Sequence, residues 1–262
     1  MGQRTKYAPG AFSWTDLTTT NQEAAKVFYG ELFGWETTEM PVGDGIFYSM
    51  MSIGGQSVAA ISSQPQQQRE AGVPPVWNSY VTVESADDAL ARAAQLGATV
   101  HAPAFDVMDA GRMGVVQDPQ GAFFLVWEPK ARLGADVVNA HGALSWNDLA
   151  SPDMDASARF YRELFGWVVE PVEGSEPQMP YMTIKTGDGG LNGGMRHLTP
   201  PGTPPHWLVY FGIDDLDAGL AKVSELGGAR IVEPMDIGPG RIAIVRDPQG
   251  AVFALYAGQL DP

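Results

Sequence analysis

The sequence predicts an α+β chain of two tandem copies of one domain, each copy containing a strand–helix–strands unit written twice. Three observations lead to this prediction: a repeat covers nearly the whole chain, helix-start signals follow short strands, and several short β-like runs follow each helix. The length of 262 residues suits two domains of ordinary size. A hydrophobic content of 44% with 18% charged residues provides each copy with a core.

The repeat consists of blocks that occur in the same order in both halves. Residues 13–17 (SWTDL) recur as 145–149 (SWNDL), and residues 28–35 (FYGELFGW) recur as 160–167 (FYRELFGW). Further blocks pair 74–77 with 204–207 and 111–121 with 240–250, the last block ending in Asp-Pro-Gln-Gly in both copies. Domain duplication explains this pattern, and we place the copies at 9–129 and 140–258.

Each copy contains two helix starts. A capping box at 20–23 (TNQE) opens an amphipathic helix that ends at Gly34, and 85–88 (SADD) opens a second helix that ends at Gly97. Strands at 11–17 and 78–83 precede them. Short β-like runs follow, joined by turns such as Asp118-Pro119-Gln120-Gly121.

The charge balance excludes several classes of partner. Lys+Arg 16 against Asp+Glu 31 gives a net charge of −15, which repels nucleic acid and anionic membrane surfaces. The chain has no cysteine, so disulfides, thiolate catalysis and Cys-ligated metals are excluded. Neither a signal peptide nor a membrane-spanning stretch is visible, and we therefore expect a cytoplasmic protein.

The order of these motifs resembles the vicinal oxygen chelate superfamily, which includes glyoxalase I, extradiol dioxygenases and the bleomycin and fosfomycin resistance proteins. The first strand, the helix ending in Phe-Tyr-x-x-Leu-Phe-Gly and the Asp-Pro-x-Gly hairpin carry the resemblance, from Pro9 to Tyr256. The resemblance implies βαβββ units that pair so that their curled sheets form an open barrel around a cavity.

The resemblance also implies where a metal would be held, and the residues there are poor ligands. The expected positions are Trp14, Asn78, Leu125 and near Ala60 in copy one, and Trp146, Leu208, Ala254 and near Gly194 in copy two. Indole and alkyl groups offer no lone pair to a cation, and the four histidines show no ligand spacing. We expect no cofactor; a divalent metal is the alternative.

Alternation along the strands predicts which side chains share the cavity. The predicted ligand-binding residues are Trp14, Asn78, Tyr80 and Trp127 in copy one, and Trp146, His206 and Tyr210 in copy two. Such a lining is typical of sites for aromatic or amphipathic small molecules. Arg112 and Arg241 are included because a guanidinium could grip a ligand carboxylate, although salt bridges to Asp106 and Asp236 explain them equally well.

Asp16 and Asp148 are the candidate catalytic residues. A carboxyl group in an apolar cavity has a raised pKa and can act as a general base. The alternative is a structural role, in which each carboxylate accepts backbone hydrogen bonds or pairs with an arginine.

Two functions follow from these observations. The first is a metal-free binding protein that holds a small-molecule ligand in a barrel cavity, as a monomer or a homodimer. The second is an enzyme of the same superfamily, either a glyoxalase-like lyase or isomerase or a hydroxylase or dioxygenase. Because the copies differ at Asn78 and Leu208, at Val76 and His206, and at Trp127 and Tyr256, one copy could bind ligand while the other is structural.

Overall fold

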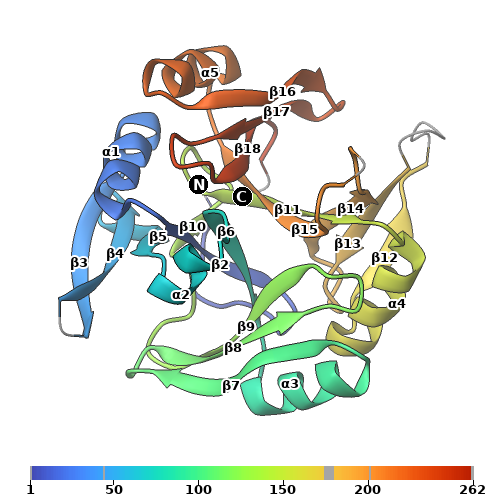
Figure 1. Ribbon diagram of the computed structural model, residues 1–262. Helices are drawn as coiled ribbons and strands as arrows, with labels where there is room; N and C mark the ends of the chain where they lie inside the picture. Colours follow the sequence, from blue (N-terminus) through green and yellow to red (C-terminus); the bar gives the residue numbers. More distant parts are fainter. Residues whose placement is uncertain (1, 44, 174–179, 201, 261–262) are drawn as a thin grey trace.

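The computed structural model describes residues 2–43, 45–173, 180–200 and 202–260, and two eight-stranded sheets dominate it (Figure 1). The helices are α1 (Gln22–Phe33), α2 (Gln66–Glu70), α3 (Ala86–Gln95), α4 (Met154–Phe165) and α5 (Leu216–Glu225). The strands of copy one are β2 (Phe12–Thr19), β3 (Glu36–Gly43), β4 (Ile46–Ile53), β5 (Gln56–Ser63), β6 (Val76–Thr82), β7 (Thr99–Val107), β8 (Gly111–Gln117) and β9 (Phe123–Pro129). Those of copy two are β11 (Leu144–Ser151), β12 (Val168–Pro171), β13 (Tyr181–Lys185), β14 (Leu191–His197), β15 (His206–Gly212), β16 (Ala229–Asp236), β17 (Gly240–Arg246) and β18 (Val252–Gly258).

Both sheets have the same topology. The strand order is β3-β4-β5-β2-β6-β9-β8-β7 in copy one and β12-β13-β14-β11-β15-β18-β17-β16 in copy two. Each sheet joins two βαβββ units through an antiparallel central pair, β2 with β6 or β11 with β15, while β2–β5 and β6–β9 are parallel. The predicted α+β fold with paired βαβββ units is therefore confirmed. The boundaries at 9–129 and 140–258 stay a prediction.

The two helices predicted for copy one are present, with a shift at the start of α1 and another at the end of α3, whose C-cap is Leu96 instead of Gly97. Asn21 rather than Thr20 is the N-cap of α1, and its side chain accepts a hydrogen bond from the backbone N–H of Ala24. Ser85 caps α3 as expected. Gly34 ends α1 in the left-handed conformation, with a φ of 72°, which favours glycine there.

The two copies are joined by reciprocal contacts between their helices and turns. The Tyr29 hydroxyl of α1 donates to Asp247 Oδ2 of copy two at 3.0 Å, and the Tyr161 hydroxyl of α4 donates to Asp118 Oδ2 of copy one at 2.8 Å. The indole of Trp35 donates to the Gly142 carbonyl across the same interface. α1 consequently lies beside α5, and α3 beside α4 (Figure 1). The interface is continuous with the hydrophobic core.

The connection between the copies runs past one end of the copy-one sheet. The carbonyl of Arg132 accepts from the Trp127 indole, and Ala135 N–H donates to the Ser13 carbonyl. Next, β10 (Val137–Val138) pairs with β1 (Gly2–Gln3), and the Tyr7 hydroxyl donates to the Ala135 carbonyl. These segments therefore cover the ends of β9 and β2. Within the described residues, no helix combines the length and hydrophobicity that a membrane crossing requires.

Candidate functional site on the two concave faces

Copy one has a buried carboxylate at the centre of its concave face. Asp16 Oδ2 accepts hydrogen bonds from the hydroxyls of Tyr80 at 2.8 Å and Tyr48 at 3.0 Å, and Asp16 Oδ1 accepts from Asn78 Nδ2 at 2.8 Å. The Trp14 indole donates to the Tyr48 hydroxyl at 2.9 Å. The cluster thus connects β2, β4 and β6 through one carboxylate.

Copy two repeats this arrangement. Asp148 Oδ1 accepts from the Tyr181 hydroxyl at 2.6 Å and from the Trp146 indole at 3.0 Å, while Oδ2 accepts from the Tyr210 hydroxyl at 2.7 Å. Leu208 stands opposite Asp148 in the register at which Asn78 stands opposite Asp16. The copies therefore share a Trp–Asp–Tyr–Tyr cluster and differ in the residue beside it.

Sequence reasoning missed the tyrosines of the hairpin strands, Tyr48 and Tyr181. Tyr48 pairs with Ser62 and Tyr181 pairs with Arg196, at equivalent registers of β4–β5 and β13–β14. A tyrosine recurs at matching places in the two copies, and this recurrence could have predicted that both belong to the site.

A glycine makes room for Tyr181. A Cβ added to Gly194 would lie 1.8 Å from the Tyr181 hydroxyl and 2.5 Å from Asp148 Oδ1. Copy one has Ala60 at this register. There Tyr48 donates to Asp16 Oδ2, the oxygen that also accepts from Tyr80. A side chain at Gly194 would therefore push Tyr181 away from Asp148.

Burial controls the protonation of these clusters. Desolvation raises the pKa of Asp16, and the hydrogen bonds from Asn78, Tyr80 and Tyr48 act in the opposite direction. Desolvation and the nearby Asp148 carboxylate hold the pKa of Tyr210 well above its usual value. The tyrosines are therefore neutral hydrogen-bond donors at physiological pH.

The concave faces differ in how far they are covered. In copy one, Trp14 is 9% exposed and Trp127 is 8% exposed, and both belong to a core cluster that also contains Ala135 of the connection. In copy two, the equivalent residues Trp146 and Tyr256 are only half-buried. The aromatic surface of copy two is therefore the more accessible of the two.

Copy two also has a polar rim that copy one lacks. Arg196 of β14 and His206 of β15 both pair with Ala150 of the central strand, so the three side chains form one row on the concave face. The corresponding residues of copy one are Ser62 and Val76, which both pair with Thr18. A cation and an imidazole thus occupy this row in copy two, where copy one has a hydroxyl and an alkyl group.

Two of the expected ligand-binding residues lie elsewhere. Arg112 bonds Asp87 of α3 at 2.8 Å and Asp106 at 3.4 Å, and Arg241 bonds Asp217 of α5 at 2.9 Å. Both arginines therefore lie on the helix-covered face, because their strand positions have the opposite parity to the concave residues. The expectation that they would grip a carboxylate inside the barrel is wrong, and the ion pair of Arg241 is with Asp217 instead of Asp236.

The residues at the family's metal positions do not fit a divalent ion. The Trp14 and Trp146 indoles can only donate hydrogen bonds, and each already donates to a tyrosine hydroxyl. Asn78 donates through Nδ2 to Asp16 and Thr18, so its amide oxygen is the one possible ligand atom among Trp14, Asn78 and Leu125. Across the described parts of the chain, no group of three or more His, Asp or Glu side chains is arranged to hold a metal.

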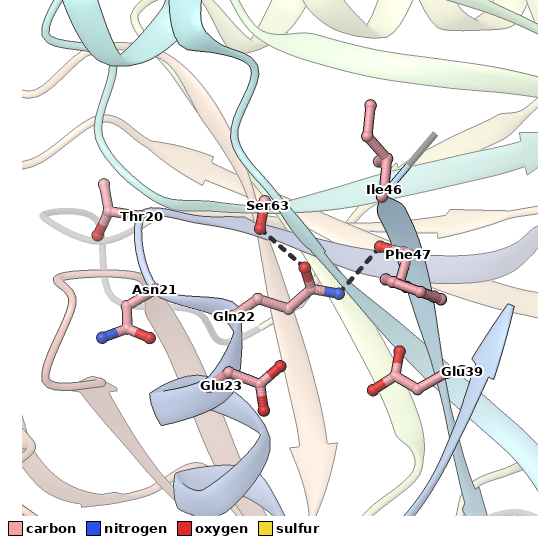
Figure 2. Close-up of a pocket in the computed structure, with 9 residues that line it drawn as sticks. Thr20, Asn21, Gln22, Glu23, Glu39, Ile46, Phe47 and Ser63 are labelled. Carbon is pink, nitrogen blue, oxygen red and sulfur yellow. Dashed lines mark hydrogen bonds between the residues drawn. The ribbon is translucent and has the colours of Figure 1, made fainter. Parts of the chain in front are cut away.

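A hollow of about 540 Å³ lies on the helix-covered side of copy one, beside the start of α1 (Figure 2). Its central side chain, Gln22, donates to the Phe47 carbonyl and accepts from the Ser63 hydroxyl, and Glu39 pairs with Lys26. The polar groups of this hollow already have partners, so we do not regard it as the candidate site. A smaller hollow of about 290 Å³ lies between the start of α3 and the end of α4.

Comparison with known proteins identifies the family. The model of the Glyoxalase/Bleomycin resistance protein/Dioxygenase superfamily matches residues 11–126 and 143–255, and the chain belongs to this superfamily. A Mycobacterium tuberculosis protein with the provisional name glyoxylase CFP32 is 42% identical over 257 residues, which cover 97% of each chain. The anthracycline biosynthesis protein DauV of Streptomyces sp. strain C5 is 32% identical, over 96% of this chain and 94% of its own.

Solved structures share the fold at low sequence identity. The 2,3-dioxygenase LapB from Pseudomonas sp. KL28 superposes with a TM-score of 0.64 at 15% identity, over 98% of this chain and 95% of its own. A Mn(II)-bound glyoxalase from Novosphingobium aromaticivorans gives a TM-score of 0.63 at 16% identity, over 95% and 82%. At these identities the likeness concerns the fold alone.

Proposed function

We propose that this protein binds an aromatic or amphipathic small molecule on the concave face of copy two and works without the metal of its superfamily. The observation that carries the proposal is the Trp–Asp–Tyr–Tyr cluster, whose tryptophan stands in both copies at the first-strand position where the resemblance implies a metal ligand. An indole in the first-strand position excludes a metal bond there.

Copy two is the proposed binding copy because its aromatic side chains are accessible. Trp146 and Tyr256 are half-buried, and they adjoin a small cluster of Leu208, Tyr210 and Ile242. Apolar surface with a few fixed polar groups is the usual character of a small-molecule site. The covered face of copy one then serves mainly to hold the fold together.

Asp16 and Asp148 have an organising role in this proposal. Each carboxylate accepts from three side-chain donors, which occupy most of its lone-pair sites. The two carboxylates instead fix the positions of the tyrosines and tryptophans around them. A cytoplasmic location and a monomeric or homodimeric state remain part of the proposal.

A neutral aromatic probe tests the proposal. In ¹H–¹⁵N spectra, we expect titration with 2-naphthamide to shift the Trp146 indole signal in a saturable way, because the probe would lie against its half-buried ring. The Trp14 indole signal should stay in place. The variants Trp146→Phe and Trp14→Phe assign the two signals and form a matched pair, and only the first should weaken binding. A saturable shift at Trp14 instead, or at neither indole, would refute the proposal.

A further inference from the structure

The rim of copy two places one positive charge, Arg196, on a chain that is strongly acidic overall. Arg196 is half-buried, and it takes part in none of the ion pairs among the described residues. Its charge acts to lower the pKa values of Tyr181, Tyr210 and His206. Arg196 also pairs with Tyr181 in the register of β13 and β14 and with Ala150 of β11, so it lies beside the concave cluster.

His206 contributes a neutral group beside this cation. Its Nδ1 lies 2.8 Å from the Pro204 carbonyl, which can only accept, so Nδ1 carries the proton and Nε2 has a free lone pair in the neutral ring. Desolvation lowers the pKa of His206, and the Arg196 charge acts in the same direction. Arg196 is consequently the cation of this row at neutral pH.

A guanidinium that has no ion pair among the described residues and lies beside half-buried aromatic rings matches one class of ligand. Arginine binds carboxylates and other compact anions through paired N–H donors, and it discriminates by geometry as well as by charge. The half-buried rings of Trp146 and Tyr256 offer flat apolar surface on the same face. The net charge of −15 repels anions in general, so an anion would be attracted only locally.

We infer that the ligand of copy two is an aromatic acid, whose ring lies against Trp146 and whose anionic group is held by Arg196. The inference rests on the proposed function and adds the charge of the ligand to it. Copy one, with Ser62 and Val76 at these positions, would not select for that charge.

The test compares 2-naphthoate with its neutral isostere 2-naphthamide, using the Trp146 indole signal of the full chain. We expect wild-type protein to bind naphthoate about tenfold more tightly than naphthamide. The variant Arg196→Ser, which introduces the residue of copy one, should abolish this preference and leave naphthamide binding unchanged. Arg132→Ser is the matched control, since it removes the same charge near Tyr48 of copy one and should keep the preference.

The outcomes separate the two proposals. If naphthamide binds at Trp146 but naphthoate binds no more tightly, or if Arg196→Ser keeps the preference, the inference is wrong and the proposed function stands. If neither probe shifts the Trp146 signal, the proposed function fails and the inference fails with it.

Discussion

Replacing Asp16 with alanine is expected to lower the free energy of unfolding by about 3–5 kcal/mol. The reason is that three buried donors, on Tyr48, Tyr80 and Asn78, would lose their common acceptor. Urea unfolding followed by circular dichroism measures the loss. Thr38→Ala, at an exposed position of the same sheet, is the control and should change stability by less than about 0.5 kcal/mol. A loss from Asp16→Ala as small as that of the control would contradict the proposed organising role.

The stabilising contribution of Asp16 is also expected to depend on pH. Its folded-state pKa is raised by burial, so the folded state favours the protonated form. The proton-linked part of its contribution is therefore fully present below the unfolded pKa of about 3.9 and is lost as the pH rises through the raised folded value. Asp16→Asn cannot titrate and serves as the reference. The stability of wild type relative to Asp16→Asn should fall as the pH rises from about 4 towards 7, and a rise over that interval would contradict the assignment.

Replacing Tyr161 with phenylalanine is expected to lower the free energy of unfolding by about 2–4 kcal/mol. The hydroxyl donates to Asp118 and accepts from the Trp207 indole at 3.0 Å, and all three residues are buried. Its removal leaves a carboxylate oxygen and an indole N–H without that partner. The bond to Asp118 also joins the two copies, so the loss includes a contribution from their docking.

The reciprocal variant Tyr29→Phe is the matched comparison. The Tyr29 hydroxyl donates to Asp247 and accepts from the Trp77 indole. The substitution should therefore lower the free energy of unfolding by a similar amount. The two tyrosines belong to different core clusters, and the losses should add within a few tenths of a kcal/mol. A near-zero effect of either variant, measured by urea unfolding, would show that the hydrogen bond does not hold the copies together.

The predictable part of this structure is the part governed by local pattern. The repeat and the helix caps led to the order of strands and helices, while the family resemblance implied how the units pair into one sheet. Alternation along the strands explains why Trp14, Asp16, Asn78 and Tyr80 lie together. Alternation along the strand also places Arg112 on the opposite face. Its neighbour Met113 packs against the concave cluster, and Arg112 therefore points to the helices.

Other features depend on the tertiary arrangement and could not be predicted from local sequence patterns. Tyr48 joins Asp16 only because β4 lies two strands from β2, with β5 between them. The Tyr of the helix motif and the Asp of the Asp-Pro-Gln-Gly turn bond each other across copies, which requires knowing how the domains pack. Arg196 of β14 and His206 of β15 form one row because both strands pair with β11, one on each side of Ala150.

Native mass spectrometry of the full chain, after incubation with Mn²⁺, Fe²⁺ or Zn²⁺ and removal of free metal, tests the central claim most directly. The Trp–Asp–Tyr–Tyr clusters predict the mass of the polypeptide, alone or with a bound organic molecule, and no mass change on adding a chelator. One or two divalent ions retained per chain and released by the chelator would contradict the account, because the metal would then be held by residues that we assign to hydrogen bonding.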